Sequence, residues 1–187
     1  MLTVLIGIGL SAASGFRIFI PFLIISIASL TGNLTLADSF SWIGTYPALI
    51  TFSLASLLEI GAYYIPWIDN LLDSIASPAA VAAGIILMGS VVVGMSPMLK
   101  WALTIIAGGG TAATIQAFTG VTRMTSSTTT GGIGNPVVST AELGGSAVLS
   151  LLAIFIPIAA AGIVIILLIW AGRILLRKFR KPAGQKK

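Results

Sequence analysis

Long apolar stretches separated by short polar ones form the main pattern of this chain. The six apolar stretches cover residues 2–30, 42–66, 78–95, 97–120, 136–156 and 157–176. About twenty apolar residues in a helix cross a bilayer, whereas a membrane barrel is built from alternating strands of about ten residues. The pattern therefore predicts an all-α integral membrane protein with about six transmembrane helices.

The first apolar stretch, residues 2–30, is too long for one straight span. It is nearly thirty residues long, so it must tilt or break. Residues 11–15, a cluster of small and polar side chains, are the place where we expect the break. The predicted fold thus includes broken or re-entrant segments.

Residues 66–75 form a short amphipathic stretch before the third apolar stretch. At helical spacing Asp69 and Asp73 share one face, and apolar side chains occupy the other. This predicts a short helix lying in the membrane interface. Alternatively, Asp69 and Asp73 attract cations to the mouth of a pore.

A run of threonine, serine and glycine fills residues 125–135. We expect a solvated cytoplasmic loop there, with Asn135 capping a helix that starts at Pro136. The alternative is a filter in which hydroxyl and carbonyl oxygens replace the hydration shell of an ion.

Composition excludes a soluble domain and most enzyme chemistry. The chain is 57% hydrophobic and only 8% charged, against roughly a quarter charged in soluble domains. It contains no cysteine and no histidine, so disulfides, thiolate nucleophiles, serine–histidine triads and the common transition-metal sites are absent. We expect no enzyme activity and no cofactor, and the sequence leaves metal binding open.

Basic residues concentrate at the C-terminus. Seven of the ten lie at or after Arg173, and they account for the net charge of +5. Residues 179–187 are therefore a predicted cytoplasmic tail that contacts lipid headgroups; nucleic acid is the weaker alternative and is not expected. Six spans then place both termini in the cytoplasm of a multi-pass inner-membrane protein, with Asp38 and Lys100 outside.

Sequence marks recur in the two halves of the chain. Residues 9–14 and 109–114 share one pattern of small residues, and residues 43–47 resemble 133–136. Ser-x-x-Glu-[Ile/Leu]-Gly occurs at residues 56–61 and again at 139–144. We predict two inverted three-helix repeats, 1–96 and 97–178, an architecture of transporters. Alternatively, duplication only produced a stable bundle.

Glycine and other small residues also recur every four positions. They form one series at Gly7, Ser11 and Gly15 and another at Gly108, Ala112 and Gly120, interrupted by Gln116. Such series allow close helix packing. A broken helix whose freed backbone groups line a site is the alternative.

Glu59, Glu142 and Arg17 are charged residues inside apolar stretches. A charge at the bilayer centre costs from about 3 to more than 10 kcal/mol, so such residues usually face a cavity or a partner. Glu59 and Glu142 predict a cation or proton site, with Ser56, Ser139 and Asn135 as further ligands; the alternative is hydrogen-bonded packing. Arg17 needs a carboxylate partner, for which either glutamate is a candidate. Such a pair would form a gate or an anion site, or it would be a structural ion pair. Arg123 is predicted to lie with Asp69 and Asp73 at the mouth of the pore or to act as a gate.

Several of these residues carry a resemblance to a known family. The motifs are Gly15-Phe16-Arg17 leading to Pro21, Glu59 followed by 65–69 and Asp73, Arg123, and 132–139 with Glu142. Over residues 7–157 the chain resembles the uncharacterised bacterial membrane family called domain of unknown function 4126. Tyr63-Tyr64 stands where relatives often carry Asp-Lys, and Leu143 where they often carry a second acid. The resemblance implies no activity.

These observations favour a small secondary transporter or channel for an ion or small polar solute, acting in the lipid bilayer through a central site. A non-transporting membrane scaffold or lipid-interacting protein is the alternative, and an intramembrane enzyme is a distant third. A homo-oligomer is compatible with either of the first two.

Overall fold

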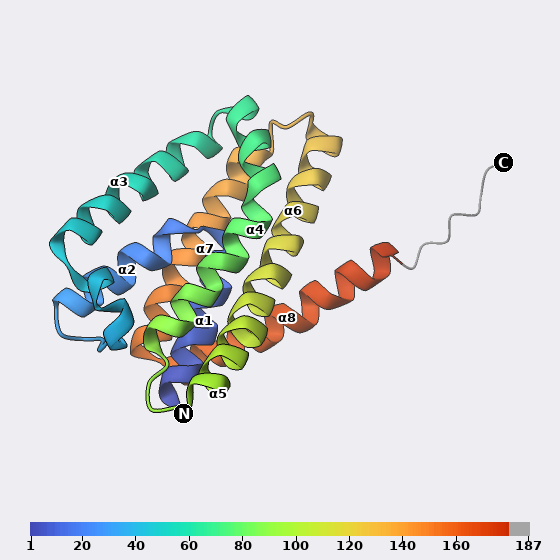
Figure 1. Ribbon diagram of the computed structural model, residues 1–187. Coiled ribbons are helices and arrows are strands. Elements are labelled where there is room, and N and C mark those ends of the chain that lie inside the picture. Colours follow the sequence, from blue (N-terminus) through green and yellow to red (C-terminus); the bar gives the residue numbers. More distant parts are fainter. Residues whose placement is uncertain (180–187) are drawn as a thin grey trace.

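The computed structural model describes residues 1–179, without the side chains of residues 66, 67, 69–71, 73, 74 and 177–179. In this part of the chain every regular element is helical (Figure 1). In order, the elements are α1 (Leu2–Phe16), α2 (Phe19–Leu30), the 3₁₀-helix η1 (Asp38–Gly44), α3 (Tyr46–Tyr63), α4 (Pro66–Val91), α5 (Pro97–Leu103), the π-helix η2 (Thr104–Gly109), α6 (Gly110–Thr130), α7 (Asn135–Phe155) and α8 (Pro157–Phe179). The basic tail predicted for 179–187 lies almost entirely outside the described residues.

Proline marks the start of five of the eight α-helices. It stands in the first turn of α3, α4, α5, α7 and α8, where its missing N–H has no helical partner to lose. At the other end of α6, Gly131 adopts φ 64°, a left-handed conformation that stops the helix. These six helix ends therefore follow from local sequence.

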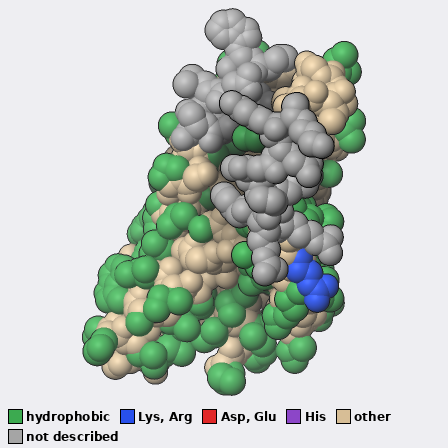
Figure 2. Space-filling view, turned by 90° about the vertical axis from the view of Figure 1, so that its right-hand side faces the viewer, with side chains coloured by type: hydrophobic (Ala, Val, Ile, Leu, Met, Phe, Trp, Pro, Cys, Tyr) green, Lys and Arg blue, Asp and Glu red, His purple; other side chains and the backbone are tan. Residues whose placement is uncertain are grey.

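The outer surface of the bundle is apolar, as a membrane protein requires. Among the described residues, four helices are long and apolar enough to cross a membrane: Tyr46–Tyr63, Pro97–Thr130, Asn135–Phe155 and Pro157–Leu176. Leu2–Phe16, Phe19–Leu30 and Ile75–Val91 are apolar but shorter. Hydrophobic side chains spread over the visible part of one face (Figure 2). The fold is thus all-α and of membrane type, while six spans and an inverted arrangement stay predictions.

Helix α1 lies at the centre of the bundle. It packs against α4, α6, α7 and α8, so it joins helices from both predicted halves (Figure 1). Its small residues permit close contact: the Ser11 hydroxyl donates to the Gly84 carbonyl at 2.8 Å. A Cβ added at Gly15 would lie 2.7 Å from the carbonyl oxygen of Ala112. These contacts support the packing interpretation of the series of small residues.

The first apolar stretch breaks, as predicted. Arg17 takes an extended backbone (φ −144°, ψ 129°) between α1 and α2. The expected place was wrong, because residues 11–15 stay within α1. The break falls just after them and puts an arginine at the discontinuity. The position of Arg17 at this break brings its charge into the interior of the bundle.

The amphipathic stretch at 66–75 is not a short helix of its own, so that prediction is wrong. It is the first part of α4, which continues through Pro78 to Val91. Proline removes one helical hydrogen bond, but the packing of α4 against α1 and α6 keeps the helix continuous. The side chains of Asp69 and Asp73 lie outside the described residues, so their role at a mouth stays a prediction.

The polar run at 125–135 is not mainly a loop, and this prediction is also wrong. α6 extends to Thr130, and only residues 131–134 form the turn. The threonine hydroxyls donate to carbonyls one turn earlier, as Thr125 does to Val121 at 2.8 Å and Thr129 to Thr125 at 2.8 Å. A hydroxyl that bonds its own helix needs no water, so the run continues the helix.

Candidate functional site

Four charged residues meet inside the bundle where α1 ends. Arg17, Glu59, Arg123 and Glu142 expose only 2%, 8%, 4% and 5% of their surface. They come from the α1–α2 break, α3, α6 and α7 respectively. We call these four residues, with Tyr63 and Ser139, the charged cluster. Because buried charges are costly when unpaired, the hydrogen bonds within the cluster decide its chemistry.

Arg123 and Glu142 form the strongest pair. The Arg123 Nε donates to Glu142 Oε1 at 3.0 Å, and its Nη2 donates to the other carboxylate oxygen. The same Nη2 lies 3.3 Å from the Ser139 hydroxyl. This two-pronged geometry is the one in which guanidinium binds carboxylate best. Arg123 is therefore buried against α7. It does not lie at the end of its helix, because α6 continues seven residues beyond it.

Arg17 completes the link across the break. Its Nη2 donates to the Ser139 carbonyl at 3.1 Å and lies 3.4 Å from Glu142 Oε2. The expectation of a carboxylate partner for Arg17 is confirmed, with Glu142 as that partner. Glu142 thus serves two guanidinium groups.

Tyr63 was not singled out from the sequence as a site residue. The Cζ atoms of Arg17 and Arg123 lie 3.7 Å and 4.2 Å from the centroid of its ring. Both distances permit cation–π attraction. Its spacing of four residues from Glu59 puts both on one face of α3, and this spacing was the available signal.

Two nitrogens of Arg17 remain without a hydrogen-bond partner. Nε and Nη1 are buried and make no bond within the described structure. A guanidinium carries five N–H donors, and an unsatisfied buried donor costs about 1–3 kcal/mol. Arg17 therefore offers donors to an oxygen acceptor at the centre of the bundle.

Glu59 has a different role from Glu142. Its Oε1 accepts the backbone N–H of Ile18 at 2.8 Å, and its Oε2 accepts that of Phe19 at 3.0 Å. These are the first donors of α2, so Glu59 caps that helix and meets its positive end. Both glutamates are buried in one region, but each is already bound to protein.

Of the remaining predicted ligands, one belongs to the charged cluster and two do not. Ser139 belongs to the charged cluster, as described. Ser56 is 2% exposed, and its hydroxyl has no hydrogen-bond partner in the described structure. Asn135 is the first residue of α7 and not its cap; its side chain exchanges hydrogen bonds with Ser127 at 3.0 and 3.3 Å. Asn135 therefore links α6 to α7.

The comparisons with known proteins agree with the motifs that supply this cluster. The family described as domain of unknown function 4126 matches residues 4–178. The chain belongs to this family. No curated protein and no solved structure matches the chain. For this DUF4126 protein, function therefore has to be argued from its own site.

Three cavities reach the charged cluster of this DUF4126 protein, each at a different charged residue. One of about 320 Å³ is lined by Glu59 and Tyr63 and is otherwise apolar. Another of about 510 Å³ lies along α6 at Arg123, and a third of about 140 Å³ touches Glu142. Glu59, Arg123 and Glu142 are thus buried, but each lines a cavity of its own.

Proposed function

We propose that this DUF4126 protein is a small transporter or channel that moves an ion or small polar solute across the inner membrane through the charged cluster. The observation that carries the proposal is Arg17, a buried arginine at a helix break with unused donors. Intramembrane charges at broken helices are typical of substrate sites in transporters.

The cavities provide space beside the charged cluster from which a solute would approach. The space at Glu59 and Tyr63 lies between α2, α3 and α4, and the space at Arg123 lies between α4 and α6. A solute that reached the cluster from these spaces would meet charged groups that are held in place by other bonds. Such fixed groups bind a ligand with little reorganisation.

The hydrogen bonds favour a solute with oxygen acceptors over a bare cation. Glu142 is shared by two arginines, and both oxygens of Glu59 accept helix N–H groups. Arg17, by contrast, has donors to spare. An anion or a neutral polar solute therefore fits the site better than the cation or proton first expected from the two glutamates.

The scaffold alternative also has an observation in its favour. Arg123 with Glu142 ties α6 to α7, and Glu59 ties α3 to α2. A cluster that acts only through these ties would stabilise the bundle without moving any solute.

A flux assay on proteoliposomes separates the two. Swelling would be followed by light scattering for chloride, nitrate, phosphate, acetate, glycerol and urea, with sodium and potassium salts compared. We expect at least one solute to enter faster than into protein-free liposomes. Arg17→Lys keeps the positive charge but loses the planar fork of donors, so its flux should fall at least roughly tenfold.

The matched control is Arg173→Lys, because Arg173 is exposed on α8. It should transport like the unchanged protein, and both variants should elute as the unchanged protein does. Absence of flux for every solute in the panel would favour the scaffold, as would equal flux for Arg17→Lys.

A further inference from the structure

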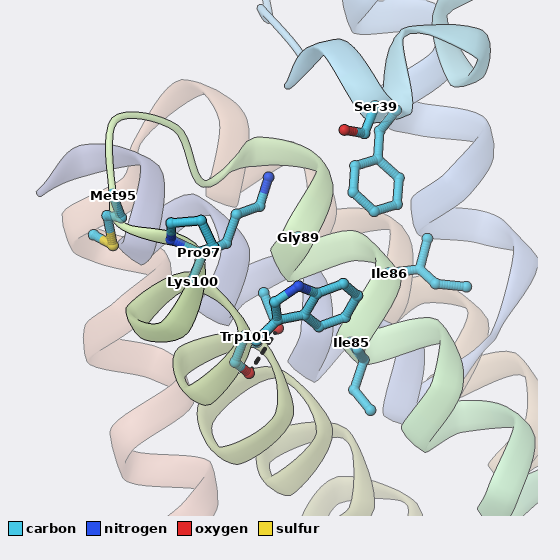
Figure 3. A pocket seen from close by; sticks show the side chains of 10 residues that line it. Ser39, Ile85, Ile86, Gly89, Met95, Pro97, Lys100 and Trp101 are labelled. Atoms are coloured by element: carbon cyan, nitrogen blue, oxygen red, sulfur yellow. Dashed lines mark hydrogen bonds between the residues drawn. The ribbon is translucent and has the colours of Figure 1, made fainter.

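A separate cavity of about 290 Å³ lies between η1, α4 and α5 (Figure 3). Its walls include Phe40, Ile85, Ile86, Gly89, Lys100 and Trp101. α5 lies near the N-terminus, whereas the charged cluster lies where α1 ends (Figure 1). α1 has fifteen residues and so separates the two by about 20 Å. This cavity is therefore not part of the charged cluster.

Lys100 is a cation without a counter-charge in this cavity. In the part of the chain that the structure describes, it forms no ion pair. Its Nζ lies 5.6 Å from the centre of the Phe40 ring. Figure 3 shows its side chain extending past Pro97 into the space between α4 and α5. A half-buried ammonium in an apolar setting attracts an anion.

The rest of the cavity suits a hydrocarbon chain. Ile85, Ile86 and Phe40 supply apolar wall, and the Trp101 ring lies beside Ile85 and Gly89 (Figure 3). The outer face of α5 is exposed and apolar, since Met98 and Trp101 expose 86% and 60% of their surface. This face meets lipid if Pro97–Thr130 spans the membrane.

The depth of Lys100 fits a lipid headgroup. It stands one turn from the end of the candidate span Pro97–Thr130, and Trp101 follows it. Lysine and tryptophan at the ends of a span mark the interface, where phosphate groups lie.

We propose that this cavity binds one anionic phospholipid of the adjoining leaflet, with the phosphate at Lys100 and one acyl chain along Ile85 and Ile86. The ammonium supplies preference for negative headgroups, and the apolar wall distinguishes a lipid from a free anion. The proposal is independent of transport, since no residue is shared with the charged cluster.

Native mass spectrometry of the full chain in detergent tests this site. We would titrate phosphatidylglycerol and phosphatidylcholine separately and compare the lipid-bound fractions. Lys100→Gln removes the charge, so phosphatidylglycerol should bind roughly tenfold more weakly or worse. Lys100→Arg, which keeps the positive charge at the same position, is its control and should leave binding of phosphatidylglycerol nearly unchanged.

A second variant fills the cavity while keeping the charge. A Cβ added at Gly89 would lie 3.4 Å from Phe40 Cζ and 3.5 Å from Thr104 Cγ2, which are ordinary contacts. A Gly89→Leu side chain would therefore enter the cavity and displace the acyl chain. Gly162→Leu, at an exposed glycine of α8 with nothing within 4 Å, is its control.

Three outcomes would overturn the proposal. They are equal binding of phosphatidylcholine and phosphatidylglycerol, unchanged binding by both Lys100→Gln and Gly89→Leu, and displacement of the lipid by inorganic phosphate at millimolar concentration. The last would assign the site to a free anion. The proposal would be supported if Lys100→Gln and Gly89→Leu both weakened binding of phosphatidylglycerol while their two control variants bound it as the unchanged protein does.

Discussion

The carboxylate of Glu59 accepts the backbone N–H of Ile18 at 2.8 Å, across the break in the first apolar stretch. Ile18 is the N-cap residue of α2 and has no side-chain acceptor of its own. A glutamate from α3 therefore does what a serine or aspartate usually does locally. This distant cap satisfies the first N–H groups of α2 without help from solvent, which lipid could not supply.

Replacing Glu59 should loosen the break. Glu59→Ala leaves the N–H groups of Ile18 and Phe19 without their acceptor, and we expect a loss of about 2–3 kcal/mol of stability. Glu59→Gln keeps one acceptor oxygen and should lose less. Thermal unfolding of the purified protein, followed by tryptophan fluorescence, measures both changes.

Ser56→Ala is the control for this series. Ser56 is buried one turn before Glu59, but its hydroxyl has no hydrogen-bond partner in the described structure. The midpoint of unfolding should hardly move. If Glu59→Ala were as mild as Ser56→Ala, the capping role would be refuted.

The Arg123–Glu142 pair should behave as a coupled unit. Removing one member of a buried pair leaves an uncompensated charge and costs about 3–5 kcal/mol. Arg123→Met and Glu142→Gln should each destabilise strongly, while the double variant should lose clearly less than the sum. Additive losses in the double-variant cycle would show that the two side chains act separately.

This coupling makes Glu142→Gln a poor probe of transport. The substitution leaves Arg17 and Arg123 facing a neutral amide, so any loss of flux combines a change in the site with a loss of fold. Flux of Glu142→Gln is therefore informative only beside its unfolding midpoint, and Arg17→Lys is the cleaner probe of function.

Close contact between α4 and η2 gives a packing prediction. A Cβ at Gly84 would lie 2.7 Å from the Gly108 carbonyl oxygen, and a Cβ at Gly108 would lie 2.7 Å from that of Gly84. Gly84→Ala and Gly108→Ala should each cost about 1–3 kcal/mol, because two backbones must separate. Thermal unfolding would measure the loss.

Gly110→Ala and Gly120→Ala provide matched controls. Both glycines are helical and have nothing within 4 Å of an added Cβ. They should be neutral or stabilising by up to about 1 kcal/mol, since alanine favours a helix more than glycine. Losses as large as those at Gly84 and Gly108 would contradict the close-packing account.

Topology can be tested with reporter tags. Ser39 and Lys100 line the same cavity, so the η1 and α5 regions lie at one end of the bundle. Tags at Asp38 and Lys100 should read outside, and tags at Ser127 and at the C-terminus should read inside. Opposite readings at Asp38 and Lys100 would contradict the structure, and a reversed tag at Ser127 would contradict the six-span arrangement.

The sequence alone determined the solvent, the element type and several local features of this protein. Few charges and long apolar stretches leave lipid as the surroundings, and lipid requires a backbone that satisfies its own hydrogen bonds. Prolines fix the starts of five helices and Gly131 fixes the end of α6, and the length of the first apolar stretch indicated that it would tilt or break. That Arg17 needs a carboxylate followed from the cost of burying a charge.

Only the tertiary structure decided how the charges are shared. Arg17 bonds to Ser139, 122 residues away, and Glu59 bonds to Ile18, 41 residues away. From the sequence, either glutamate could be the partner of Arg17. Helical spacing shows which residues of one helix share a face, but it does not show which residues of two helices meet. The choice of Glu142 for the arginines and of Glu59 for α2 depends on which helix faces meet, and packing among distant segments sets that.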